Sequence, residues 1–156
     1  MRLTIAAVGR LKRGPEAALV EDYLSRCSKT GRALGLGPAQ VIEVEDRKGG
    51  GMAAEAALLA AKLLEGAKVV VLDERGAVLA SPVFATRLAG WRDDGVRDTV
   101  FVIGGADGVD ASLRERADLC LSFGKMVWPH MLVRVMVAEQ LYRATTILAG
   151  GPYHRE

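Results

Sequence analysis

Apolar residues along the chain follow two patterns, and the two patterns alternate. Short continuous apolar runs are typical of strands that are covered on both faces of a parallel sheet. Such strands are predicted at 3–8, 41–45, 69–72, 100–103 and 119–122. Between them, apolar residues recur at helical spacing, which predicts helices at 15–29, 52–65, 81–91, 110–117 and 130–148. The alternation predicts an α/β fold of three layers with a mostly parallel sheet.

Length and composition fit one domain without a separate recognition module. The chain has 156 residues, and a domain typically takes ~100–200. Half of the residues are apolar and 26% are charged, which excludes disordered and fibrous proteins. The net charge is only +2, so contact with a polyanion would need a local basic patch. We therefore predict a single domain over residues 1–156.

The cysteines and the N-terminus point to an intracellular protein. Cys27 and Cys120 are the only cysteines and form no CxxC pair or Cys/His cluster, so a zinc site is not expected and reduced thiols are favoured over one disulfide. The apolar run at 3–8 is too short for a signal peptide or a membrane span. We expect a cytoplasmic protein with neither a membrane segment nor a metal.

Two predicted strands end in glycine-containing segments where a ligand could bind. These are Leu72–Gly76, with the sequence LDERG, and Ile103–Gly108, with the sequence IGGADG. Ligands of parallel sheets bind at the carboxyl ends of strands, where glycine lets the backbone approach them closely. Tight turns without a ligand are an equally good interpretation of the glycines alone. The chain has no P-loop motif, no GxGxxG after the first strand, and no GxSxG or HExxH motif.

Most of the remaining candidate chemistry lies in the last predicted helix. The two histidines of the chain are His130 and His154, so imidazole chemistry is confined to this region. Arg134 follows His130 by one turn and shares its helix face. Glu139 and Arg143 have i,i+4 spacing, which suits a surface ion pair as well as a binding role. The apolar face of this helix is broad enough that part of it is a candidate dimer interface.

The C-terminal tail combines aromatic and basic side chains. Tyr153, His154, Arg155 and Glu156 end the chain. Tyr and Arg together can stack on an unpaired base and bind a phosphate. A charged tail that is merely solvated is the alternative.

Taken together, six ordered segments resemble the ribosomal RNA large subunit methyltransferase H family, a minimal branch of the SPOUT methyltransferases. The similarity spans the full length of the chain, and the ordered set is far more specific than any one segment. The segments are Leu72–Gly76, Ile103–Gly108, Leu121–Ser122, Pro129–His130, Glu139–Ala144 and Pro152–Glu156.

This resemblance implies an enzyme that uses S-adenosylmethionine to methylate N3 of a pseudouridine in 23S rRNA of the assembled ribosome. It also implies a homodimer, and a fold whose C-terminal part forms a trefoil knot. In the family, three loops at the knot hold the cofactor. The matching residues here are Leu72, Asp73, Gly76, Gly104, Gly105, Phe123, Gly124, Lys125, Met126, Val127 and Trp128. Family members commonly carry Thr at the position of Val127 and a small polar residue at that of Gly124, so backbone contacts are carried over there.

Methyl transfer to N3 of a uracil-like ring needs alignment of the reactants, exclusion of water, and a base or cation near the acceptor. The candidates for this role are His130, Arg134, His154 and Arg155. No single general base is assigned among them. Leu72, Met126, Val127 and Trp128 are candidates for an apolar adenine slot.

A short chain without an RNA-binding domain is expected to build its RNA surface from both protomers, with the tail of one chain completing the pocket of the other. Basic residues near the N-terminus and after the second strand could add phosphate contacts, although solvated surface charge explains each one equally well. They are Arg10, Lys12, Arg13, Arg47 and Lys48. The alternatives are a non-catalytic nucleotide- or RNA-binding module, and a doubly wound enzyme with another nucleotide cofactor.

Overall fold

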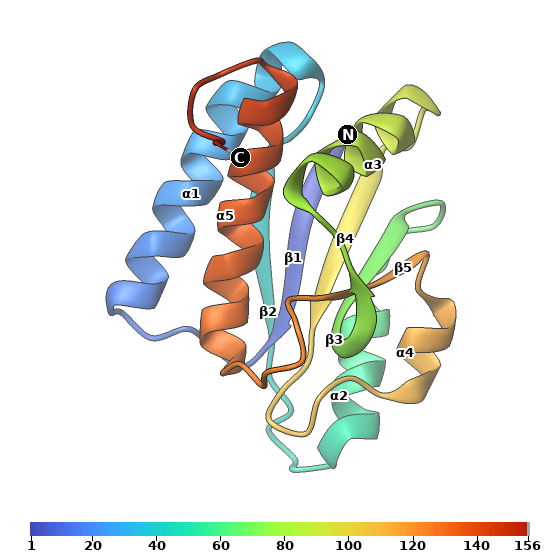
Figure 1. Ribbon diagram of the computed structural model, residues 1–156. Helices are drawn as coiled ribbons and strands as arrows, with labels where there is room; N and C mark the ends of the chain where they lie inside the picture. Colours follow the sequence, from blue (N-terminus) through green and yellow to red (C-terminus); the bar gives the residue numbers. More distant parts are fainter. Residues whose placement is uncertain (156) are drawn as a thin grey trace.

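Five strands form one sheet in the computed structural model, which describes residues 1–155 (Figure 1). The strands are β1 (Arg2–Val8), β2 (Ala39–Val44), β3 (Lys68–Val78), β4 (Asp98–Ile103) and β5 (Leu119–Ser122). Their order in the sheet is β2-β1-β4-β3-β5, and the strand pairings are all parallel. The predicted parallel sheet is therefore confirmed.

Helices cover both faces of the sheet and make the three predicted layers (Figure 1). They are α1 (Pro15–Gly31), α2 (Gly51–Ala60), α3 (Ser81–Asp93), α4 (Ala111–Arg116) and α5 (His130–Leu148), with a 3-10 turn at Arg32–Leu34. Side chains of a strand alternate between its faces. Leu3 and Ile5 accordingly pack with α1, α3 and α5 in one core, whereas Ala6 and Val8 pack with α2 and α4 in the other.

Most element boundaries lie within about two residues of the sequence prediction, and two differ by more. The predicted helix over 52–65 ends at Ala60, because Lys62 and Leu63 donate their amides to the carbonyls of Leu59 and Ala60 in tighter turns. Strand β3 reaches Val78 instead of ending at residue 72. The reason for the longer strand lies in its second contact with β5.

Strand β3 pairs with β5 twice, on either side of a bulge. Leu72 and Ala77 both lie opposite Leu121, and Val78 pairs with Ser122. Residues 73–76 are looped out between the two pairings. The hydroxyl of Ser122 donates to the carbonyl of Glu74 at 3.1 Å and fixes the bulge to β5.

Gly76 makes the return of β3 to β5 possible. A Cβ on Gly76 would lie 2.6 Å from the carbonyl carbon and oxygen of Cys120. No real Cβ approaches backbone atoms so closely, and the neighbour here cannot rotate away. A side chain at this position would therefore push the two strands apart.

After β5, the chain crosses the β3–α3 segment before it enters α5 (Figure 1). Residues 123–129 then lead from β5 to α5, which packs against α1 and α3 on the opposite side of the sheet from α2 and α4. This route is consistent with the trefoil knot expected at the C-terminal end. Among residues 1–155, no helix is both long and apolar enough to cross a membrane.

Gly76→Ala is expected to lower the free energy of unfolding by about 3 kcal/mol, because a methyl group is forced against the backbone of β5. Urea unfolding followed by circular dichroism measures the change. Gly90→Ala is the matched control, since Gly90 is exposed in α3 and its added Cβ would meet no atom within 4 Å. The control should gain about 0.5–1 kcal/mol from helix propensity. Equal stability of the two variants would contradict the proposed role of Gly76.

Candidate active site

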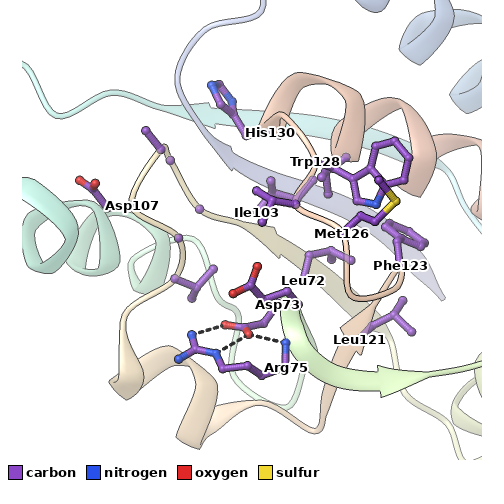
Figure 2. Close-up of a pocket in the computed structure, with 18 of the residues that line it drawn as sticks. Leu72, Asp73, Arg75, Ile103, Asp107, Leu121, Phe123, Met126, Trp128 and His130 are labelled. Atoms are coloured by element: carbon purple, nitrogen blue, oxygen red, sulfur yellow. Dashed lines mark hydrogen bonds and ion pairs between the residues drawn. The ribbon is translucent and has the colours of Figure 1, made fainter.

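A cavity of about 280 Å³ opens at the carboxyl ends of β3, β4 and β5 (Figure 2). Its lining comes from three segments, 72–75, 103–109 and 121–128, together with His130 and Val133 of α5. Ligands of parallel sheets bind at this edge. The structure thus brings the three loops of the family resemblance to one place.

One part of the cavity wall is apolar. Leu72, Ile103, Leu121 and Val133 lie between the strand ends and α5. Phe123, Met126 and Trp128 gather at one side of the cavity, opposite His130 and Asp107 (Figure 2). Such a slot suits the flat face of an adenine ring.

The loop after β4 presents its backbone to the cavity. Gly108 donates its amide to the carbonyl of Gly105 at 3.1 Å, which closes a tight turn. A Cβ on Gly104 would collide with the carbonyl of Gly108, so this turn requires glycine. Gly104 and Gly105 both line the cavity and offer backbone groups to the polar part of a ligand.

The carboxylate of Asp73 is held inside its own loop. The Nε and Nη2 atoms of Arg75 donate to its two oxygens at 2.8 and 2.9 Å, and the Arg75 amide donates at 2.9 Å. These hydrogen bonds hold the pKa of Asp73 below its usual range. The Asp73 side chain is only 5% exposed, so it shapes the β3 bulge at the edge of the cavity.

His130 is the candidate catalytic residue that lines the cavity. It opens α5 directly after Pro129 and is partly buried. Its Nδ1 atom is buried and has no hydrogen-bond partner among the described residues. Buried polar atoms are nearly always paired, so the hydrogen-bonding capacity of this imidazole is not fully used among the described residues.

Arg134 is placed outside the cavity, contrary to the prediction that it acts on the substrate. Its side chain is 1% exposed. The guanidinium donates to the carbonyls of Val8 and Gly9 at 3.1 and 3.2 Å and to the Glu43 carboxylate at 2.9 Å. Burial lowers the pKa of Arg134, and Glu43 opposes that shift. This arginine ties α5 to the end of β1, which is a positioning role.

The tail folds back on the C-terminal half of α5 in the same chain (Figure 1). Tyr153 donates to Glu139 at 3.0 Å, and its ring lies 4.7 Å from that of Tyr142. Arg143 donates to Glu139 and contacts the Nδ1 atom of His154 at 3.3 Å. The predicted i,i+4 pair of Glu139 and Arg143 is therefore present, and the tail packs on it.

One chain does not bring all of the predicted catalytic residues together. Arg143, which contacts His154, follows His130 by thirteen residues in α5, a separation of about 20 Å along the helix. Arg155 follows His154 directly and is exposed, and Glu156 lies outside the described residues.

Two predicted cofactor residues lie beside the cavity without lining it. Gly76 packs on β5, and Lys125 is exposed on the loop before α5. The apolar wall residues Val109, Leu121 and Val133 were missed by the sequence prediction. The only signal that the sequence offers for them is that each is an apolar residue near the end of a strand or helix. Among residues 1–155, no group of three His, Cys, Asp or Glu side chains could hold a metal ion.

A parallel sheet with helices on both faces and a ligand cavity beside its C-terminal segment fits the α/β fold class of the SPOUT methyltransferases. The sequence profile described as predicted SPOUT methyltransferase matches residues 1–154, and the chain belongs to this family. S-adenosylmethionine is the methyl donor of the family. The apolar slot suits its adenine ring, and the backbone groups of the Gly104 turn suit its polar end.

Relatives with assigned names match the chain over its whole length. A protein of Paracoccus denitrificans named ribosomal RNA large subunit methyltransferase H is 69% identical over 156 residues, 100% of both chains. A protein of the same name from Ruegeria pomeroyi is 67% identical over 155 residues, 99% of both. The solved structure of a probable methyltransferase from Bordetella pertussis is 12% identical, with a TM-score of 0.51 over 92% of this chain and 96% of that one. The last likeness concerns the fold alone.

Arg134→Met is expected to lower the free energy of unfolding by about 3 kcal/mol, because two carbonyls lose this donor and the Glu43 carboxylate loses its ion pair. Urea unfolding provides the measurement. Arg87→Met, at an exposed site on α3, is the control and should change stability by less than about 0.5 kcal/mol. If Arg134→Met kept full stability and lost only methyl transfer, Arg134 would act on the reactants after all.

Proposed function

We propose that this chain methylates N3 of a pseudouridine in 23S rRNA within the assembled ribosome. The observation that carries the proposal is the cavity at the β3, β4 and β5 ends in a chain that matches large-subunit rRNA methyltransferases from end to end. The choice of N3 of pseudouridine rests on the family resemblance. Because assembled ribosomes work in the cytoplasm, we propose that the enzyme acts there.

Different cavity residues are proposed to hold different parts of the cofactor. Leu72 and the 123–128 segment form the apolar slot for adenine, with backbone groups at its edge. Gly104 and Gly105 let the main chain approach the ribose and the amino-acid end. S-adenosylmethionine supplies an electrophilic methyl group when bound. The protein contributes by aligning donor and acceptor and by excluding water between apolar walls.

His130 is the residue best placed to act on the acceptor base. The N3–H of a uracil-like ring must lose its proton as the methyl group arrives. The imidazole of His130 lines the cavity and is proposed to accept that proton or to hydrogen-bond the ring beside it. A cation near the flanking carbonyls would stabilise the developing charge, and Arg155 of a second chain is the candidate.

A homodimer supplies what one chain lacks. The tail is about 20 Å along α5 from His130 of its own chain, so its His154 and Arg155 are proposed to serve the other protomer. An apolar surface at the start of α5 supports such an association. It is formed by Met126, Val127, Trp128, Met131 and Leu132, with Val127 81% exposed. Surfaces of this kind mark interaction sites.

RNA contact is proposed to spread over both protomers. Arg10, Lys12 and Arg13 are exposed between β1 and α1, and Arg47 and Lys48 are exposed after β2. Both segments follow the carboxyl ends of strands and therefore lie at the sheet edge that carries the cavity. Phosphate contacts from them would orient the acceptor base without a recognition domain.

His130→Gln is expected to lower methyl transfer by at least about 100-fold, because the proton acceptor is lost, and to leave the affinity for S-adenosylhomocysteine within about threefold. Transfer of labelled methyl groups to whole ribosomes that lack the modification gives the rate. Separate subunits and free rRNA test the substrate, and mass spectrometry of nuclease digests identifies the methylated position. Tight cofactor binding with no transfer to any of these RNAs would favour the non-catalytic module instead.

A chain that lacks residues 153–156 is expected to dimerise normally and to lose methyl transfer. Light scattering and the ribosome assay measure the two properties. Mixing this truncated chain with full-length His130→Gln should restore part of the activity, because one pocket of the mixed dimer then has an intact His130 and the partner's tail. Each variant alone is the control. Full activity of the truncated chain would exclude a role for the tail, and a mixture as inactive as its components would exclude action on the other protomer.

A further inference from the structure

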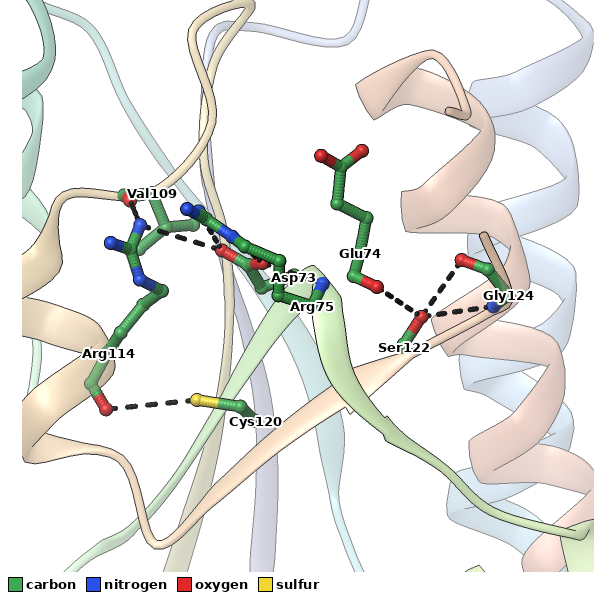
Figure 3. A network of polar contacts seen from close by, with 8 residues as sticks. All are labelled: Asp73, Glu74, Arg75, Val109, Arg114, Cys120, Ser122 and Gly124. Carbon is green, nitrogen blue, oxygen red and sulfur yellow. Dashed lines mark hydrogen bonds and ion pairs between the residues drawn. The ribbon is translucent and has the colours of Figure 1, made fainter. Parts of the chain in front are cut away.

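One side chain outside the cavity joins two of its walls. Arg114 lies in α4, on the opposite side of the sheet from α5, and does not line the cavity. Its Nη1 atom donates to the carbonyl of Val109 at 2.5 Å and lies 3.6 Å from Oδ2 of Asp73 (Figure 3). Val109 follows Gly104–Gly108, the glycine loop after β4, and Asp73 begins the bulge of β3.

The contact with Val109 bears directly on the shape of the glycine loop. Val109 is buried, and its Cγ2 would lie 3.0 Å from a Cβ on Gly104. Gly108, the residue before it, is packed still closer to Gly104. A shift of the Val109 carbonyl would therefore move the turn that presents Gly104 and Gly105 to the cavity.

The contact with Asp73 ties the same guanidinium to the β3 bulge. Arg75 also binds this carboxylate, but it belongs to the same loop and is largely exposed. Arg114, with a side chain 27% exposed, is the arginine that reaches Asp73 from another element. The lowered pKa of Asp73, caused first by its hydrogen bond with Arg75 and in part by the Arg114 charge, keeps the carboxylate ionised for this contact.

The main chain of Arg114 is tied to the third wall as well. Its carbonyl accepts a hydrogen bond from the thiol of Cys120 at 3.7 Å (Figure 3). Cys120 lies in β5, directly before the wall residue Leu121. Contacts of one residue thus reach the bulge of β3, the loop after β4 and strand β5, and these three elements form the rim of the cavity.

We propose that Arg114 is a positioning residue for the cofactor: it sets the spacing between the β3 bulge and the Gly104–Gly108 loop without touching the ligand. The inference rests on the proposed binding of S-adenosylmethionine in this cavity. Loss of the guanidinium lets the two walls move independently, and a ligand that needs both walls at once binds less tightly as a result.

The test compares Arg114→Met, Arg114→Lys and Arg116→Met in the full chain. Arg116 is exposed in the same turn of α4, so its replacement removes the same charge from the same helix. Calorimetry with S-adenosylhomocysteine gives the dissociation constant of each, and thermal unfolding without ligand gives its stability. Hydrogen exchange of the 104–109 segment reports on the loop itself.

Arg114→Met is expected to weaken binding by about tenfold or more, since a charge-assisted hydrogen bond and an ion pair are lost. Arg114→Lys should recover part of the affinity because an ammonium can still bind one acceptor. Arg116→Met should bind like the wild type. The 104–109 amides should exchange faster in Arg114→Met alone. If Arg114→Met shows no cooperative unfolding transition, Arg114→Lys and Arg114→Gln are compared with the wild type instead. The affinity is then expected to fall from the wild type to Arg114→Lys and further to Arg114→Gln.

Wild-type affinity in all Arg114 variants would overturn the inference, as would an equal loss in Arg116→Met. A lower unfolding temperature with unchanged affinity and exchange would also overturn it, because Arg114 would then stabilise the fold without positioning the walls. Failure of the wild-type chain to bind S-adenosylhomocysteine would overturn the cofactor proposal together with this one. Binding by the wild type with no effect of the variants would overturn only the role of Arg114.

Discussion

The double pairing of β3 with β5 is the constraint on which the rest of the site depends. Leu72 and Ala77 lie opposite the same residue of β5, so the four residues between them must leave the sheet. That bulge forms one wall of the cavity, and its second pairing carries the chain on to α3. The chain passes this segment at β5, on its way to α5 (Figure 1). The close approach of Gly76 to the backbone of Cys120 therefore underlies both the pocket and the C-terminal crossing.

Several ionised side chains at and around the cavity are paired with one another and hold its frame. Asp73 is bound by Arg75 and approached by Arg114, and Arg134 is bound by Glu43 and two carbonyls. Each of these groups is paired within the protein. Buried nitrogens without a partner among the described residues are Nδ1 of His130, Nε of Arg134 and Nε2 of His154. Of these three residues, His130 is the one that lines the cavity. Reactivity in the proposed mechanism is accordingly assigned to this imidazole, and the arginines of the frame fix the geometry around it.

The elements with strong periodicity were predictable from the sequence, and contacts between distant segments were not. The apolar runs of β1 and β4 and the stripe of α5 carry their own signal, since burial demands it. The second half of β3 contains Asp73, Glu74 and Arg75, which break the apolar run, and its pairing depends on β5 more than 40 residues away. Arg134 has the spacing of a partner for His130, but carbonyls 125 and 126 positions away take up its guanidinium.

The residues of the candidate site were likewise predictable only where the sequence carries a local signal. The residues alone indicated the strand ends at 72–76 and 103–108, because glycine after an apolar run is a local signal. The loop at 123–128 carries no comparable signal and came from the family resemblance. Wall residues such as Val133 resemble any other core position of an amphipathic helix. Contacts of the tail with Glu139 and Arg143 likewise depend on how the chain turns after Gly150.

The late position of the segment that closes the cavity also has a consequence for the order in which the site forms during synthesis. The cavity takes walls from β3, β4 and β5, and it is closed by the loop and helix that follow. Nearly the whole polypeptide must therefore have left the ribosome before a ligand site exists. A chain that ends before α5 would retain the strands of the sheet and lack the wall that His130 and Val133 provide.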